Sequence, residues 1–139
     1  MTSKITQPKE RYSTRKAIDK LVKELNMPHE NWMQDWPYEI ADSSQIDSYI
    51  NYYQTITDED EKLLLMKAIL QATEEQDSQE LLLKYWDTIH HFLNEDFHIH
   101  EYTIYYWCCF DNDDLEDSWK ITPLMRNFFI EKQNLATYL

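Results

Sequence analysis

Apolar side chains return every three or four positions along most of this chain, which is the spacing of one face of an α-helix. The first clear stripe comprises Ile18, Leu21, Val22 and Leu25. Ser13 or Thr14 can cap its start, and Met27-Pro28 follows its end. The pattern therefore predicts a regular amphipathic helix between these two points.

Three further helices are predicted between residues 43 and 95. Ser43 or Ser44 can cap the first of them, whose stripe comprises Ile46, Tyr49, Ile50, Tyr53 and Ile56. The second begins at Thr57, which together with Asp60 resembles a capping box, and runs to about Glu75. Its apolar residues span more than one face, as in a central helix packed on two sides. The third is opened by Asp77 or Ser78 and carries Leu81, Leu82, Tyr85, Trp86, Ile89 and Leu93.

Two segments have a less regular pattern. Residues 28–43 contain two prolines and two tryptophans without periodicity, which indicates a loop anchored by aromatic packing. Residues 96–110 are rich in β-branched and aromatic residues, as strands are, but their apolar residues also align at helical spacing behind Asp96 as a cap. We favour the helix, because nothing else in the chain offers a second strand. A last helix is predicted from Ile121-Thr122-Pro123 to about Ala136.

The chain of 139 residues contains no glycine. Hairpin turns, phosphate-binding loops and dinucleotide-binding turns depend on glycine, so folds built on them are disfavoured. The predicted fold class is therefore all-α. We expect a single domain of five to six helices over residues 13–139, packed as antiparallel helical hairpins, after a mobile polar lead-in at residues 1–12.

Charge is distributed unevenly. The formal net charge is −13, yet residues 1–24 hold seven basic and three acidic side chains, a net of +4 that leaves −17 for the remainder. An acidic surface repels nucleic acid and attracts a basic protein partner. We interpret the basic segment as pairing with the chain's own acidic surface, with a nucleic-acid arm as the alternative.

The expected location is the cytoplasm. The longest apolar runs are far shorter than the roughly 20 residues of a membrane span, and the first residues lack the apolar segment of a secretory signal. Cys108 and Cys109 are adjacent, and a disulfide between neighbours would be strained. We read them as reduced core residues in a reducing compartment.

Two groups of residues suggest catalysis or metal binding. His90, His91, His98 and His100 lie close together in sequence, but on a helix His98 and His100 point about 200° apart and neither pair has the spacing of a helical zinc site. A strand would instead bring His98 and His100 to one face. The aromatic and acidic neighbours of the cysteines should raise their thiol pKa, which disfavours a nucleophile. No metal or cofactor is predicted, and a metal-dependent enzyme that uses these histidines and the carboxylates is the alternative.

The segment after residue 110 is the densest carboxylate cluster, but it lacks the central glycine and the spaced glutamate of a calcium loop. Tyr105, Tyr106, Trp107 and Trp119 flank it. Aromatic anchors beside a charged rim are typical of an interface hot spot. A solvated acidic surface, with the aromatic residues in the core, is the alternative. The predicted partner-binding site comprises Asp111, Asp113, Asp114, Glu116, Asp117, Trp119, Tyr105 and Tyr106.

Over roughly its last 80 residues, the chain resembles small HEAT-like helical proteins that act as immunity proteins beside bacterial toxins. Two motifs carry the resemblance, Phe97-His98-Ile99-His100-Glu101-x-x-Ile104 and Trp119-Lys120-Ile121-Thr122-Pro123-Leu124-Met125-Arg126. It implies a HEAT-like fold and a non-enzymatic inhibitor that binds and neutralises a basic toxin, such as a nuclease domain. A structural adaptor without a toxin partner is a further alternative.

Overall fold

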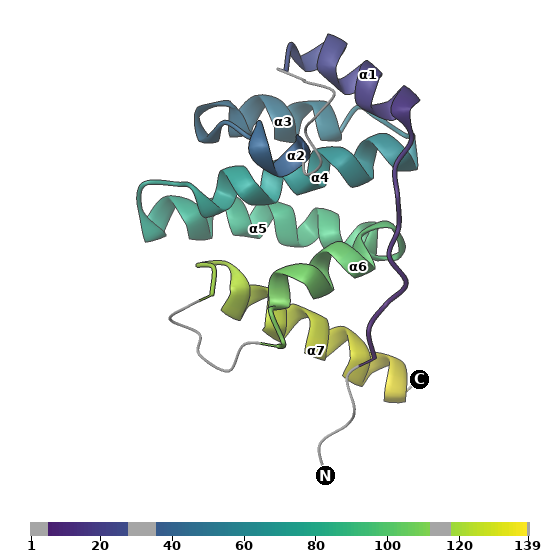
Figure 1. Cartoon of the computed structure of the whole chain (residues 1–139). Coiled ribbons are helices and arrows are strands. Elements are labelled where there is room, and N and C mark those ends of the chain that lie inside the picture. Colours follow the sequence, from purple (N-terminus) through teal and green to yellow (C-terminus); the bar gives the residue numbers. More distant parts are fainter. Residues whose placement is uncertain (1–5, 28–35, 112–117, 139) are drawn as a thin grey trace. The chain divides into compact units, whose positions relative to one another are not determined.

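The computed structural model describes residues 6–27, 36–111 and 118–138, with the last four of these as backbone only. All regular structure in these ranges is helical (Figure 1). The residues fall into two compact units, a larger unit of Tyr12–Ile99 and a smaller unit of Met1–Arg11 with His100–Leu139. The prediction of one domain over 13–139 stays a prediction, and we describe each unit by itself.

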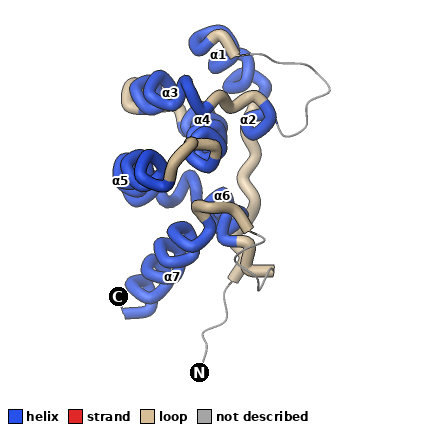
Figure 2. The backbone as a smooth tube through the Cα atoms, turned by 90° about the vertical axis from the view of Figure 1, so that its left-hand side faces the viewer, coloured by secondary structure: helices blue, strands red, loops and turns tan. Residues whose placement is uncertain are grey.

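The larger unit is built around α4 (Glu59–Glu74). This helix contacts α1 (Arg15–Leu25), α2 (Trp36–Glu39), the 3₁₀ turn η1 (Ser43–Gln45), α3 (Ile46–Tyr53) and α5 (Gln79–Glu95). Figure 2 shows α4 between α2 and α3. Its buried apolar residues occupy more than one face, which confirms the expected central helix: Leu63, Leu64, Leu65, Met66, Ala68, Ile69, Leu70 and Ala72.

Side-chain caps set most of the helix starts in this unit. The side chains of Thr14 and Ser78 accept hydrogen bonds from backbone N–H groups in the first turns of α1 and α5, as two of the predicted caps do. The predicted cap of the central helix was wrong by one position, because Asp58 rather than Thr57 accepts from the Glu61 N–H at 3.0 Å. Asp42 caps η1 in place of Ser43 or Ser44.

The predicted loop at 28–43 is partly helical. Residues 28–35 lie outside the described ranges, but Trp36–Glu39 form the short helix α2, which was not predicted. Trp36 is buried, as the aromatic anchoring required. Ile56, placed on the predicted α3 stripe, is buried but lies beyond the end of that helix.

The smaller unit contains most of α6 (Phe97–Cys108) and all of α7 (Thr122–Tyr138). Residues 96–110 are therefore helical over most of their length, which confirms the favoured alternative. The core of this unit is apolar and aromatic and comprises Ile104, Trp107, Cys108, Ile121, Met125, Phe128 and Phe129. Between α6 and α7, residues 112–117 lie outside the described ranges.

Antiparallel packing of consecutive helices is supported for one pair, α4 and α5. Helices α4 and α5 contact each other and are joined by residues 75–78, so the chain reverses direction there (Figure 1). None of the helices in the described ranges has the length and apolar character that crossing a membrane requires.

We expect Leu65→Ala to lower the free energy of unfolding by about 2–5 kcal/mol, because Leu65 is fully buried in α4 and its truncation leaves a cavity. Leu83→Ala is the matched control, since Leu83 on α5 is 43% exposed. It should change stability by less than about 0.5 kcal/mol. Denaturant unfolding of both variants measures the difference, and equal losses would contradict the assigned core.

Candidate functional site

An aromatic hollow of about 440 Å³ lies in the smaller unit, at the C-terminal end of α6. Tyr102, Tyr105 and Tyr106 share one face of that helix, because they are three and four positions apart. The segments after α6 and before α7 supply further walls, and one residue of the N-terminal segment completes the lining. The lining residues are Gln7, Tyr102, Tyr105, Tyr106, Cys109, Phe110, Asp111 and Trp119.

The tryptophan at the hollow rests on a buried neighbour. The ring centroids of Trp119 and Trp107 are 4.4 Å apart, and Trp107 is only 1% exposed. Trp119 itself is half-buried, and its centroid lies 5.5 Å from that of Tyr106, which is 43% exposed. One face of the cluster therefore belongs to the core while the other reaches solvent.

Tyr105 and Phe110 form a second group of rings. Their centroids lie 5.8 Å apart, and each lies within 6 Å of the centroid of Phe129 in the core. Tyr102 extends this row, with its centroid 6.3 Å from that of Tyr105. Contacts with Phe129 on α7 thus fix the orientation of these walls.

Arg126 on α7 holds the end of α6 in place. Its Nε donates to the Cys108 carbonyl at 2.6 Å, and a second guanidinium nitrogen donates to the Cys109 carbonyl at 2.7 Å. The Thr122 hydroxyl donates to the Trp107 carbonyl at 2.9 Å. These side chains satisfy carbonyl groups that a helix end leaves without intrahelical partners. They also fix the backbone from which Phe110 and Asp111 project.

The structure brings four of the eight predicted site residues together. Tyr105, Tyr106, Asp111 and Trp119 line the hollow, and Asp111 is exposed. The other four, Asp113, Asp114, Glu116 and Asp117, lie outside the described residues. Sequence reasoning missed Tyr102 and Phe110 as wall residues, although the three-residue spacing of Tyr102 and Tyr105 was visible. Of the flanking aromatic residues, Trp107 belongs to the core.

The four clustered histidines lie in different environments. His91 pairs with Glu95 at 3.2 Å, and His98 pairs with Glu59 at 3.3 Å, both at exposed positions. His90 lies beside the Trp86 ring, and His100 is fully buried. The exposed His98 and the buried His100 agree with the opposite directions expected on a helix. Within the described ranges, no three His, Cys, Asp or Glu residues gather in a way that could hold a metal ion.

The two thiols are disfavoured as nucleophiles, as the sequence predicted. Burial raises the pKa of Cys108 to about 12. Burial also raises the pKa of Cys109, with a smaller contribution from the negative charge of Asp111. A thiol whose pKa is raised in this way carries little thiolate at neutral pH.

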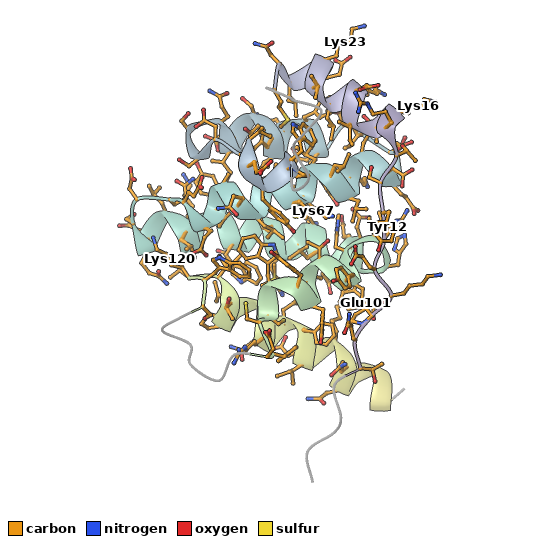
Figure 3. All side chains as sticks on the ribbon, viewed as in Figure 1. Tyr12, Lys16, Lys23, Lys67, Glu101 and Lys120 are labelled. Atoms are coloured by element: carbon orange, nitrogen blue, oxygen red, sulfur yellow. The ribbon has the colours of Figure 1, made fainter. Side chains whose placement is uncertain are left out.

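A second hollow, of about 470 Å³, lies in the larger unit between α1 and the start of α4. Glu61 forms part of its wall and is only 3% exposed. Its carboxylate lies 3.5 Å from Lys20 Nζ, and its other oxygen, Oε1, has no hydrogen-bond partner among the described residues. A lysine of the basic N-terminal region thus pairs with an acid of α4, as the self-pairing interpretation expects. Lys16 and Lys23, which lie on α1 with Lys20, project outward from that helix (Figure 3).

Comparisons with protein families, with curated proteins and with solved structures found no match to this chain. The site must therefore be interpreted from its own geometry.

Arg126→Met should lower the free energy of unfolding by about 1.5–3 kcal/mol, because it removes two charge-assisted hydrogen bonds to helix-end carbonyls. Arg15→Met is the matched control. Arg15 forms an exposed pair with Asp19 within α1, which contributes about 0.5 kcal/mol or less. Denaturant unfolding compares the two, and similar small losses would show that Arg126 does not hold the end of α6.

Cys108 should stay unmodified by a thiol reagent at pH 8 in the folded protein and react at once after unfolding. Because burial raises its pKa above that of the unfolded chain, its contribution to stability is complete below the unfolded value near pH 8.5 and declines as pH rises toward 12. Between pH 9 and 10.5, unfolding free energy should therefore fall more steeply in the natural chain than in Cys108→Ala, by about 1 kcal/mol per pH unit. Rapid labelling of Cys108 in the folded state would refute its burial.

Proposed function

We propose that this chain is an acidic protein-binding module that binds and neutralises a basic protein, most simply an immunity protein for a basic bacterial toxin domain such as a nuclease. The observation that carries the proposal is the aromatic hollow, where Tyr105, Tyr106 and Trp119 lie beside Asp111. Partly exposed aromatic rings next to a charged rim are the composition of a binding hot spot.

Charge supports a cationic partner. The net charge of −13 favours encounter with a basic surface, and the sequence from Asp111 to Asp117 adds five carboxylates next to the hollow along the chain. In this proposal the carboxylates accelerate association, and the rings slow dissociation.

The remaining features fit the same role. The helical fold and the hairpin of α4 and α5 are compatible with a HEAT-like arrangement, which we propose for the chain. The raised pKa values of both thiols favour a binding protein over an enzyme with a cysteine nucleophile. An inhibitor of this kind protects the cell that makes the toxin, so we place its action in the cytoplasm.

The direct test is neutralisation of a partner. The protein encoded beside this chain, expressed alone, should arrest bacterial growth, and co-expression of this chain should restore growth. The purified pair should associate faster at low than at high salt. Growth arrest that this chain does not relieve, together with no binding between the purified proteins, would reject the proposal.

Reversing Asp113, Asp114 and Glu116 to Lys should slow association with that partner by about tenfold or more at low salt and flatten the salt dependence, because these charges act on encounter. Dissociation should change little. Reversal of Glu75, Asp77 and Glu80, which are exposed on the larger unit, changes the net charge equally and is the control. Stopped-flow or surface-based kinetics measure both. An equal slowing by the two sets would leave only a general charge effect.

Trp119→Ala should instead speed dissociation by roughly 30-fold, which corresponds to the ~2 kcal/mol of an aromatic anchor. Trp86→Ala is the control, because Trp86 is also half-buried and also lies beside another ring. Thermal melts of both variants separate binding from folding. A large drop in melting temperature with unchanged dissociation would make Trp119 a core residue.

A further inference from the structure

The aromatic hollow has walls that favour a cation. Five of its lining residues are aromatic, one is the exposed carboxylate Asp111, and no lysine or arginine belongs to the lining in the described part of the chain. The faces of aromatic rings carry negative potential and attract ammonium and guanidinium groups within about 6 Å of the ring centre. A carboxylate at the rim adds a charged acceptor.

The second hollow lacks this character. Its walls include Lys16 and Lys20, and Lys20 already lies 3.5 Å from the carboxylate of Glu61. A cation supplied by another molecule would have to displace a lysine of the chain itself. Of the two hollows, the aromatic one is therefore the better receptor for an external positive charge.

Arg126 on α7 already places a guanidinium over an aromatic ring of the wall. Arg126 Cζ lies 5.6 Å from the ring centroid of Phe110, and Phe110 also lines the hollow. A planar guanidinium can lie against rings and still donate hydrogen bonds from its edge to a carboxylate, whereas an ammonium is a compact and strongly hydrated charge. Ring walls beside a carboxylate therefore suit an incoming arginine better than an incoming lysine.

The hollow is large enough to admit one arginine side chain. The volume of about 440 Å³ lies near the lower end of the roughly 300–1,000 Å³ typical of small-ligand pockets. The surrounding rings are held by Trp107 and Phe129, so the walls are formed before binding.

We propose that the aromatic hollow is a receptor for one arginine side chain of the partner protein, whose guanidinium lies against Tyr106 and Trp119 and donates to Asp111. This inference rests on the proposed function, because it names the part of a basic partner that the hollow would hold.

The probes are three capped tripeptides, glycine–X–glycine, in which X is arginine, its neutral isostere citrulline, or norleucine. Binding to the full chain is followed by NMR through the indole N–H of Trp119, assigned with Trp119→Phe. The arginine peptide should shift this signal with a dissociation constant in the millimolar range. The citrulline peptide should bind at least fivefold more weakly, and norleucine more weakly still.

Two variants and two controls locate the site. Asp111→Asn should weaken binding of the arginine peptide at least threefold and remove most of the preference over citrulline. Tyr106→Leu should weaken it at least threefold, because one ring face is lost. Asp77→Asn and Tyr12→Leu are the controls, since both residues are exposed and lie outside the lining. Both should bind as the natural chain does.

Equal binding of arginine and citrulline, tighter binding of norleucine, or full binding by Asp111→Asn and Tyr106→Leu would overturn the arginine receptor. These outcomes are independent of growth rescue. Rescue without arginine preference would leave the proposed function intact and reject this inference, whereas arginine preference without rescue would support the receptor and reject the toxin partner.

Discussion

A chain without glycine must end each helix with residues that carry a Cβ atom, and this constraint governs the rest of the structure. Helices commonly end in a left-handed residue, which is usually glycine. Here Asn26 takes that conformation after α1, at φ 51°, and Cys109 takes it after α6, at φ 50°. Asparagine tolerates it well, whereas Cys109 has only a weak local bond from its thiol to the Tyr106 carbonyl, at 3.9 Å, to offset the steric cost.

Several polar contacts gather at the end of α6, where Cys109 takes its left-handed conformation. Arg126 binds two consecutive carbonyls there, and Thr122 binds the one before them. These contacts stabilise a turn that glycine would form without help. The same turn directs Phe110 and Asp111 to the wall of the aromatic hollow. The backbone constraint and the candidate site are therefore parts of one local arrangement.

Much of this fold could be predicted because helix starts are encoded locally. Thr14 and Ser78 stand directly before apolar stripes, so caps and periodicity agree. Asp58 was missed because Thr57 and Asp60 match the spacing of a capping box, although aspartate is the stronger cap by type. The site was predictable in composition but not in exposure. Tyr106 and Trp107 are neighbours of similar character, and only the contact of Trp107 with the core makes one exposed and the other buried.

Fixed walls affect the entropy of binding at the aromatic hollow. Binding usually costs about 0.5–1.5 kcal/mol for each flexible side chain that becomes ordered at an interface. Trp119 already lies on Trp107, and Tyr105 already lies against Phe129. The rings therefore lose little freedom when a ligand arrives. In the proposed complex, affinity at the hollow therefore depends on the core that supports the rings. A substitution at a fully buried residue such as Trp107 would then weaken binding without contacting the bound side chain.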